Sequence, residues 1–307
     1  ECVAHVWGGL AGVATQTRWA PDSRIVLFSV TKGLAAIALH LLAARGKLEW
    51  DAPVATAWPG FAARGKERMT FRELFNHRGG LSGIDAPLSL GDCIDPSMRG
   101  RVRSALEQQR PAWEPGTDQG YHAITFGLYA REVFEALAGE PMGPFLKREL
   151  FDPLESDARM GAEPELDASV ATLYPPTAAA RLTGFIGALA TGSSAESRLI
   201  KDIVSRDSLS RRAFVNPKSG PRGVSAYNDV PVRRADLPWA SATASADGLA
   251  RAYLPFAEGG EHAGRTYFEA STLTPIFERQ SWSEQDRVLH KPLGWSQGFL
   301  KDEPDVF

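Results

Sequence analysis

One stretch of the sequence decides how the rest of the chain is interpreted: Phe28-Ser29-Val30-Thr31-Lys32-Gly33. A short apolar run at 25–27 precedes it, and an apolar segment over 34–44 follows it and ends at Arg45-Gly46. An apolar segment of this length that stops at a glycine is typical of a single helix. Because Ser29 and Lys32 are three residues apart, the helix would place both side chains on one face near its start.

A serine and a lysine in contact at the positive end of a helix form a plausible nucleophile pair. A serine hydroxyl attacks poorly until a base removes its proton. Burial and the helix N-terminus both disfavour the ammonium form of Lys32, so we expect its pKa to fall. The backbone N–H of Ser29 is then a candidate oxyanion donor. A capped core helix with one lysine that reaches the surface explains the same residues, and Ser-x-x-Lys alone does not separate the two interpretations.

Tyr121 is the candidate for a second proton-transfer group. It follows the rigid loop Trp113-Glu114-Pro115-Gly116 and directly precedes a predicted helix. A neighbouring lysine cation lowers the pKa of a tyrosine, which makes the phenol a usable proton shuttle. A half-buried tyrosine packed under a loop is the simpler alternative, and the spacing alone favours it.

The composition is that of an ordinary globular protein, with 307 residues, 43% of them hydrophobic, and a formal net charge of -3. This charge, without any block of like charges, argues against a nucleic-acid partner. The chain has two cysteines, and its six histidines show no His-Glu-x-x-His spacing, so we predict no metal site. It also lacks a glycine-rich phosphate-binding loop, so we predict no cofactor. No apolar run reaches the length of a membrane span and no signal peptide is visible, so we expect a cytoplasmic protein.

Strand patterns gather at the two ends of the chain, with helix patterns and loops between them. We expect a hairpin from 2–7 and 11–17 across Gly8-Gly9-Leu10, a final strand over 295–300, and a helix over 71–76 that begins with a capping box at Thr70 and Glu73. Further helices are expected over 96–109, 122–138, 142–150, 177–190, 195–206, 246–256 and 272–279. Residues 152–176 and 207–243 lack periodic runs and are expected to form loops.

This order of elements predicts an α/β (α+β) chain, in which helices flank an antiparallel sheet built from both chain ends and a mostly helical domain is inserted. The expected sheet domain is discontinuous and covers 1–75 with 236–307. The expected helical domain covers 76–235.

Four motifs occur in the order found in β-lactamase-like serine hydrolases. They are Phe28-Ser-Val-Thr-Lys-Gly33, Leu74-Phe-Asn-His-Arg-Gly-Gly-Leu81, Trp113-Glu-Pro-Gly116 and Gly120-Tyr-His-Ala-Ile-Thr-Phe-Gly127. The chain resembles most closely the family VIII carboxylesterases, which are similar to class C β-lactamases and penicillin-binding proteins. The resemblance is strong over 25–160 and loose after that.

The resemblance implies a β-lactamase/transpeptidase-like fold with the site in the cleft between sheet and helical domain. It also implies an acyl-enzyme at Ser29, with Lys32 and Tyr121 exchanging the proton. The segment from His77 to Leu81 resembles a structural loop of the family, so His77 is given no catalytic role.

The residues after Tyr121 depart from the class C pattern. Class C β-lactamases carry an asparagine two residues after the tyrosine, where it contacts the substrate amide, and here that position is Ala123, after His122. The departure argues against β-lactam hydrolysis, fits the esterase branch, and makes His122 and Ala123 candidate substrate-binding residues. Trp239 lies in a segment that resembles one near the family's cleft and is a candidate for the acyl pocket, although an ordinary buried tryptophan explains it as well.

The family also carries a third motif, Lys-Thr-Gly or His/Trp-x-Gly, on a late strand that lines the site. No Lys-Thr-Gly occurs here. His262-Ala263-Gly264 and Trp7-Gly8-Gly9 match the letters, but we expect the first in a surface turn and the second in the first hairpin. We therefore expect that the chain is clipped at both ends and that the motif, with the second oxyanion donor, lies beyond Phe307.

The sequence thus predicts a serine carboxylesterase that acts on a small-molecule ester with a short acyl chain. The same site would suit a β-lactamase, an amide hydrolase or an acyltransferase, and the scaffold would suit a penicillin-binding receptor without turnover. The natural ester and the oligomeric state are not predicted.

Overall fold

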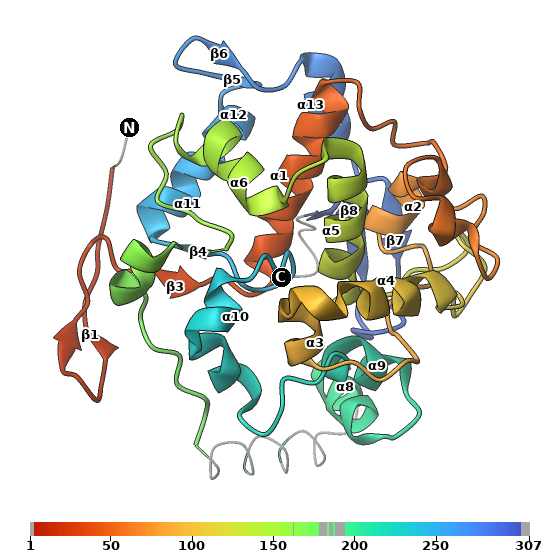
Figure 1. Ribbon diagram of the computed structural model, residues 1–307, viewed down its shortest axis with the longest axis horizontal. Helices are drawn as coiled ribbons and strands as arrows, with labels where there is room; N and C mark the ends of the chain where they lie inside the picture. The colour runs from red at the N-terminus through yellow and green to blue at the C-terminus, as the bar shows by residue number, and fades with distance from the viewer. Residues whose placement is uncertain (1–2, 162, 178–182, 184–186, 188–193, 302–307) are drawn as a thin grey trace.

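Helix α1, Val30–Ala44, runs through the middle of the molecule with other helices around it (Figure 1). The structure is a computed structural model that describes residues 3–161, 163–177, 183, 187 and 194–301. Residues 34–39 have no exposed surface, as expected for a helix that is apolar all round. After the helix, Gly46 has a φ of 67° and the N–H of Lys47 donates to the carbonyl of Leu42 at 2.9 Å. The predicted helix and its glycine stop are confirmed.

The other helices are shorter and surround α1 on several sides. Before residue 152 they are α2 (Phe71–Phe75), α3 (Leu90–Ile94), α4 (Arg99–Gln108), α5 (Thr125–Ala138), α6 (Met142–Leu146) and the π-turn η4 (Lys147–Phe151). After it they are α8 (Ala195–Val204), α9 (Leu209–Val215), α10 (Val230–Arg234), α11 (Ala246–Ala252), α12 (Leu254–Ala257) and α13 (Ala270–Phe277). Five 3₁₀ turns complete the described set: η1 (Val54–Thr56), η2 (Pro59–Ala62), η3 (Pro96–Met98), η5 (Pro164–Ser169) and η6 (Gly223–Asn228).

Most predicted helices coincide with observed ones. The capping box of α2 is confirmed, because the N–H of Glu73 donates to Thr70 Oγ1 at 3.1 Å and the N–H of Thr70 donates to Glu73 Oε2 at 2.9 Å. The predicted loop over 207–243 is wrong in part, since α9, η6 and α10 lie within it. These helices are too short to show apolar periodicity in the sequence. The predicted helix over 177–190 falls almost entirely outside the described residues.

The strands are two to four residues long and form four small antiparallel sheets in the described part of the chain. β1 (Leu10–Gly12) pairs with β2 (Thr17–Arg18), β3 (Ile25–Val26) with β4 (Thr243–Ala244), and β5 (Glu261–His262) with β6 (Arg265–Thr266). The largest sheet has the order β7 (Ser281–Ser283), β8 (Leu293–Ser296), β9 (Phe299–Leu300). Helices combined with short antiparallel sheets confirm the expected fold class.

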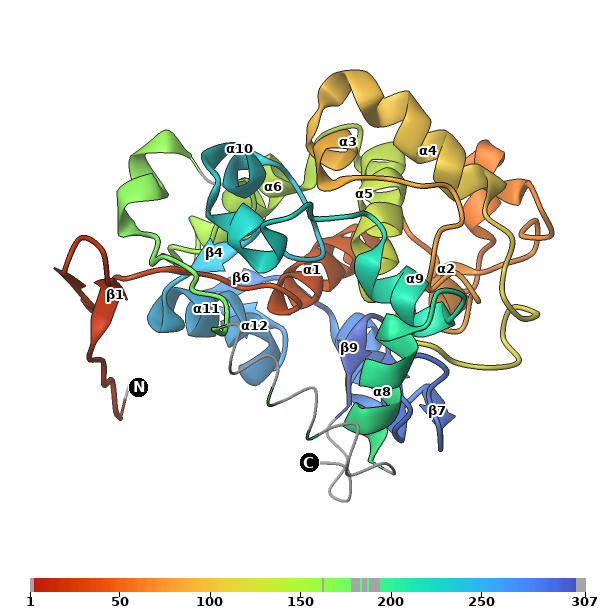
Figure 2. The same cartoon turned by 90° about the horizontal axis from the view of Figure 1, so that it is seen from below.

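The two ends of the chain do not share one sheet within the described residues. The β1–β2 hairpin stands at one side of the molecule and the β7–β9 sheet lies at another (Figure 2). The first hairpin also differs from the prediction, because its turn lies at 13–16 and residues 3–8 precede it outside any strand. Val3 and Val6 are 92% and 91% exposed, so the alternating pattern there faces no partner.

The β3–β4 pair places the start of α1 by joining distant parts of the chain. Ile25 pairs with Ala244, and the N–H of Leu27 donates to the carbonyl of Ala242 at 2.8 Å. Both strands belong to the expected sheet domain, 1–75 with 236–307. Its separation from a helical domain over 76–235 stays a prediction.

Candidate functional site

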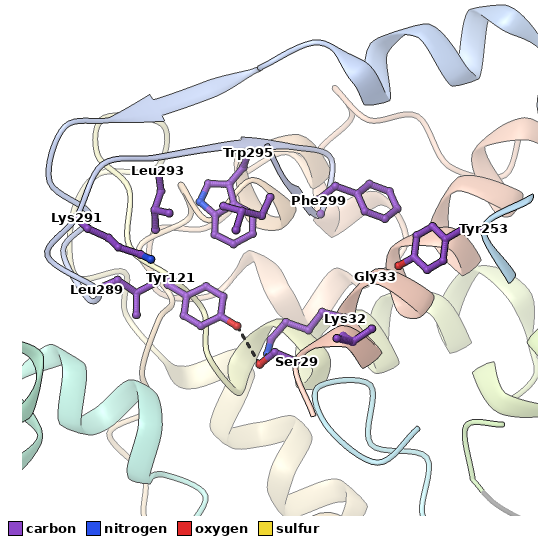
Figure 3. Close-up of a pocket in the computed structure, with 13 residues that line it drawn as sticks. Ser29, Lys32, Gly33, Tyr121, Tyr253, Leu289, Lys291, Leu293, Trp295 and Phe299 are labelled. Carbon is purple, nitrogen blue, oxygen red and sulfur yellow. Dashed lines mark hydrogen bonds between the residues drawn. The ribbon is translucent and has the colours of Figure 1, made fainter. Parts of the chain in front are cut away.

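A largely apolar cavity of about 450 Å³ lies beside the first turns of α1 (Figure 3). Ser29, Lys32 and Tyr121 gather at one part of it, and apolar and aromatic side chains from the second half of the chain form much of the wall. The residues that line it are Ser29, Val30, Lys32, Gly33, Tyr121, Tyr253, Leu289, Lys291, Leu293, Trp295, Gly298, Phe299 and Leu300. A concave apolar site with a few converging polar groups is the usual form of a small-molecule site.

Ser29 occupies the position directly before α1 and is exposed to the cavity. Its dihedral angles, φ -63° and ψ -16°, are already helical, whereas Phe28 before it has a φ of 45°. A positive φ at a bulky residue is a strained conformation, of the kind that occurs at functional sites. No described residue accepts a hydrogen bond from the backbone N–H of Ser29, so this donor is available at the helix start.

Lys32 reaches back one turn, and its Nζ donates to Ser29 Oγ at 2.9 Å. The side chain is almost fully buried, and no carboxylate of the described residues forms an ion pair with it. Burial lowers the pKa of Lys32 from its usual 10.5, and the charge of Tyr121 and its hydrogen bond oppose this only in part. The burial that the sequence suggested is therefore present, and it favours the neutral amine.

Tyr121 approaches Ser29 from the other side, and its hydroxyl donates to Ser29 Oγ at 3.1 Å. The ring is stacked on Trp295 of β8, with centroids 5.6 Å apart and planes at 9°. The Lys32 Nζ lies 5.2 Å from the centroid of the Tyr121 ring. The structure thus brings together the three residues that the sequence selected. The alternative interpretations, a capped core helix and a tyrosine packed under a loop, did not require this contact.

His77 supports the segment that carries Tyr121. Its carbonyl accepts the N–H of Gly120 at 3.0 Å, and its Nδ1 accepts the N–H of His122 at 3.0 Å. An Nδ1 that accepts a hydrogen bond implies the tautomer with its proton on Nε2. Burial, together with the charges of His122 and Lys32, keeps the pKa of His77 well below 6.5. The ring is neutral and holds a loop, as the structural assignment of this segment expected.

The three predicted substrate-binding residues lie outside the cavity lining. His122 is fully buried against His77 and burial lowers its pKa to about 3, while Ala123 is buried in a small cluster with Ala213 and Val288. Trp239 donates through Nε1 to the hydroxyl of Tyr227 at 3.1 Å. Trp239 packs in the core, as expected for an ordinary buried tryptophan.

Sequence reasoning did not select the far wall of the cavity. This wall lies more than 160 positions from Tyr121 in the sequence, so only folding brings the two together. It includes Leu289, Lys291, Trp295 and Phe299. The one available indication was the predicted final strand over 295–300. It forms as the β8–β9 hairpin, with its turn at Gln297 and Gly298.

The two segments that match the letters of the third motif lie away from the cavity. His262-Ala263-Gly264 forms the β5–β6 turn, in which Ala263 and Gly264 have φ values of 48° and 77°. The expected surface turn is confirmed. Trp7-Gly8-Gly9 is not inside the first hairpin but precedes it, and Trp7 is 51% exposed.

The described residues contain no group of three or more His, Cys, Asp or Glu side chains that could hold a metal ion. Among the same residues, no helix is long and apolar enough to cross a bilayer.

The chain is similar to several known proteins, among them esterases. Esterase/beta-lactamase LipL of Mycobacterium tuberculosis is 32% identical over 302 residues, which are 97% of this chain and 65% of LipL. The chain therefore spans about two thirds of that relative. A solved family VIII carboxylesterase is 27% identical with a TM-score of 0.79, and the match covers 97% of this chain and 72% of that one.

Two further solved structures are similar to this chain. A penicillin-binding protein homologue from Caulobacter crescentus is 28% identical with a TM-score of 0.78, over 97% of this chain and 72% of that one. EstA from Arthrobacter nitroguajacolicus Rue61a is 25% identical with a TM-score of 0.77, over 92% and 70%. The sequence model of the Beta-lactamase family matches residues 1–303. This chain, with a serine, a lysine and a tyrosine joined at the start of its central helix, belongs to the Beta-lactamase family.

Proposed function

We propose that this protein is a serine carboxylesterase that hydrolyses short-chain acyl esters through an acyl-enzyme at Ser29. One observation carries the proposal: Ser29 Oγ is held by both Lys32 Nζ and the Tyr121 hydroxyl, at 2.9 and 3.1 Å, inside an apolar cavity. A nucleophile within hydrogen-bond reach of its base is the arrangement that covalent catalysis needs. Membership of the Beta-lactamase family and the likeness to a family VIII carboxylesterase and LipL support a serine hydrolase.

Acylation begins with the neutral amine of Lys32. Nζ takes the proton of Ser29 Oγ as Oγ bonds to the ester carbonyl carbon, and the carbonyl electron pair moves onto its oxygen. The backbone N–H of Ser29 is placed to donate to that oxyanion. When the carbonyl re-forms, the bond to the alcohol oxygen breaks. The leaving oxygen takes a proton from the Tyr121 hydroxyl, which Lys32 replaces.

Deacylation repeats these transfers with water. A water oxygen bonds to the acyl carbon while its proton passes to the Tyr121–Lys32 pair. The bond to Ser29 Oγ then breaks, and Oγ takes the proton back as the carboxylic acid leaves. The lowered pKa of Lys32 supports both steps, since the same amine must accept and return a proton near neutral pH.

The cavity wall supports an apolar acyl or alcohol group. Leu289, Leu293 and Phe299 provide it, and Trp295 stacks on Tyr121 beside them. The volume of about 450 Å³ suits a small molecule rather than a polymer.

A second candidate is β-lactam hydrolysis, which the name of LipL includes and which the same three residues would serve. The position that holds the amide-binding asparagine in class C β-lactamases is Ala123 here, and it is buried. A side chain without a hydrogen-bonding group cannot hold a substrate amide, so esters remain the favoured substrates.

Replacement of the nucleophile tests the proposal. We expect Ser29→Ala to abolish hydrolysis of p-nitrophenyl butyrate, because no other hydroxyl occupies the position between Lys32 and Tyr121 in the described structure. Ser97→Ala is the matched control, because that exposed serine hydroxyl donates to Asp95 and to no other residue that the structure describes. Full esterase activity in Ser29→Ala would end the proposal.

A parallel assay with a chromogenic cephalosporin separates the two substrate classes. Comparable turnover of both substrates would move the assignment to a broad acyl hydrolase. A long-lived acyl adduct in intact mass spectra, without turnover of either substrate, would indicate a penicillin-binding receptor instead.

A further inference from the structure

We propose that Asp286 is a positioning residue for Tyr121, joining its backbone to the turn that forms part of the cavity wall. The inference rests on the role proposed above for Tyr121 and concerns a carboxylate that no sequence pattern singled out. Asp286 contacts neither Ser29 nor Lys32 and acts through the segment that it holds.

One carboxylate oxygen collects three backbone donors from two distant segments. Asp286 Oδ1 accepts the N–H of Tyr121 at 3.1 Å and the N–H groups of Val288 and Leu289, each at 2.9 Å. The side chain is fully buried. A buried oxygen with three donors is hard to replace, because loss of the acceptor leaves all three N–H groups without a partner.

The turn that Asp286 closes belongs to the cavity. The N–H of Asp286 donates to the carbonyl of Lys291 at 3.0 Å, and the N–H of His290 donates to the carbonyl of Asp286 at 2.9 Å. Leu289 and Lys291 of this turn line the cavity. The Asp286 side chain therefore holds both the backbone of Tyr121 and the cavity wall beside it.

His77 holds the residues on either side of Tyr121, whereas Asp286 accepts the N–H of Tyr121 itself. Stacking on Trp295 fixes the tilt of the ring, with planes at 9°, but a flat stack resists sliding weakly. The hydroxyl must stay within reach of Ser29 Oγ, now 3.1 Å away. A displacement of about 1 Å in a reacting group can lower a rate about 100-fold, so a small backbone shift at Tyr121 matters.

The second carboxylate oxygen of Asp286 allows two substitutions to be compared, one that keeps the accepting oxygen and one that removes it. Oδ2 is buried and takes part in none of these three backbone hydrogen bonds. Asp286→Asn therefore keeps the oxygen that accepts all three N–H groups, whereas Asp286→Ala removes it. Asp236→Ala is the matched structural control, because Asp236 Oδ2 also accepts a backbone N–H, that of Gly143 at 3.1 Å, and does not line the cavity.

The experiment measures kcat and KM on p-nitrophenyl butyrate, per site titrated with a fluorophosphonate, for the full chain. We expect Asp286→Ala to lower kcat about 10- to 100-fold with KM changed less than about threefold. Asp286→Asn should stay within about threefold of the parent protein. Asp236→Ala should lose thermal stability but keep kcat per titrated site.

A double-mutant cycle with Tyr121→Phe distinguishes positioning from general damage to the fold. If Asp286 acts through the Tyr121 hydroxyl, Asp286→Ala should have little further effect on kcat once that hydroxyl is gone. Additive losses in the double variant would overturn the proposal. So would unchanged kcat per titrated site in Asp286→Ala, or equal loss in Asp286→Asn and Asp286→Ala.

The outcome is separable from the proposed esterase function. If the parent protein hydrolyses no ester, the proposed function fails by itself. The rate at which a fluorophosphonate labels Ser29 then serves as the readout, because labelling needs an activated serine but no ester turnover. The same order of the variants is expected, and equal labelling rates would contradict the role of Asp286.

Discussion

At the scale of single residues, the site consists of one hydroxyl between an amine and a phenol. Ser29 Oγ receives hydrogen bonds from Lys32, on the same helical turn, and from Tyr121, which lies 92 positions further along the chain. The sequence placed Ser29 and Lys32 on one helical turn because spacing on a helix is fixed. It could not place Tyr121, since contact between distant segments depends on how they pack.

The protonation of Lys32 predicts the pH dependence of the proposed activity. Burial lowers its pKa below 10.5, so the fraction of neutral amine rises with pH and reaches one half below that value. We expect any rise of kcat/KM with pH to have its midpoint below pH 10.5. Lys32→Arg cannot supply a neutral base, and we expect it to lose activity about 100-fold or more.

The measurement is kcat/KM for a p-nitrophenyl ester between pH 5.5 and 9.5 on the parent protein. Lys47→Arg, at an exposed position beyond the end of α1, should keep the parent profile. A kcat/KM that falls as the pH rises across this range, or full activity in Lys32→Arg, would contradict a neutral lysine base.

At the scale of elements, the sequence predicts helix α5, whereas only the structure shows which segment α5 packs against. Its apolar positions over 124–137 predict an amphipathic helix, and the structure contains α5 over most of that range. Which segment it packs on was not readable from the pattern. Gly127 allows a close approach, since a Cβ there would lie 2.4 Å from the backbone nitrogen of Trp239.

Gly127→Ala should therefore lower stability even though alanine favours helices. The added methyl group meets backbone atoms of Pro238 and Trp239, which cannot rotate away, so we expect a loss of about 1–3 kcal/mol in the free energy of unfolding. Urea unfolding followed by circular dichroism measures this.

Gly100→Ala in α4 is the control for Gly127→Ala. Nothing lies within 4 Å of a Cβ at Gly100, so this substitution should be neutral or stabilise by about 0.4–1 kcal/mol. A Gly127→Ala variant as stable as Gly100→Ala would show that the α5 contact yields without cost.

At the scale of the whole molecule, buried neutral histidines couple stability to pH. His40, His77 and His122 are fully buried, and burial lowers the pKa of His40 and of His122 to about 3 and that of His77 well below 6.5. Below pH 6.5 the unfolded chain binds protons that the folded chain does not. Stability is therefore fully present above pH 6.5 and is lost as the pH falls toward the folded pKa values.

Each such histidine contributes a slope of up to about 1.4 kcal/mol per pH unit between pH 6.5 and the folded pKa. We expect the melting temperature to fall steadily from pH 7 to pH 5. His40→Gln should reduce this slope, while His5→Gln, at an exposed position, should keep it. A melting temperature that is constant over this range would be inconsistent with three neutral buried rings.

The sequence by itself determined the central helix with its glycine stop, the capping box of α2, the fold class and the pairing of Ser29 with Lys32. The helix, the capping box and the pairing follow from local rules, in which periodicity, caps and spacing act over a few residues. The fold class follows from the order of the elements along the chain and from the family resemblance. Only the tertiary structure decided that Tyr121 meets Ser29, that β8 and the turn after Asp286 form the cavity wall, and that His122 and Trp239 pack inside. Contacts between residues more than 90 positions apart depend on the packing of whole elements, which no local pattern in one sequence specifies.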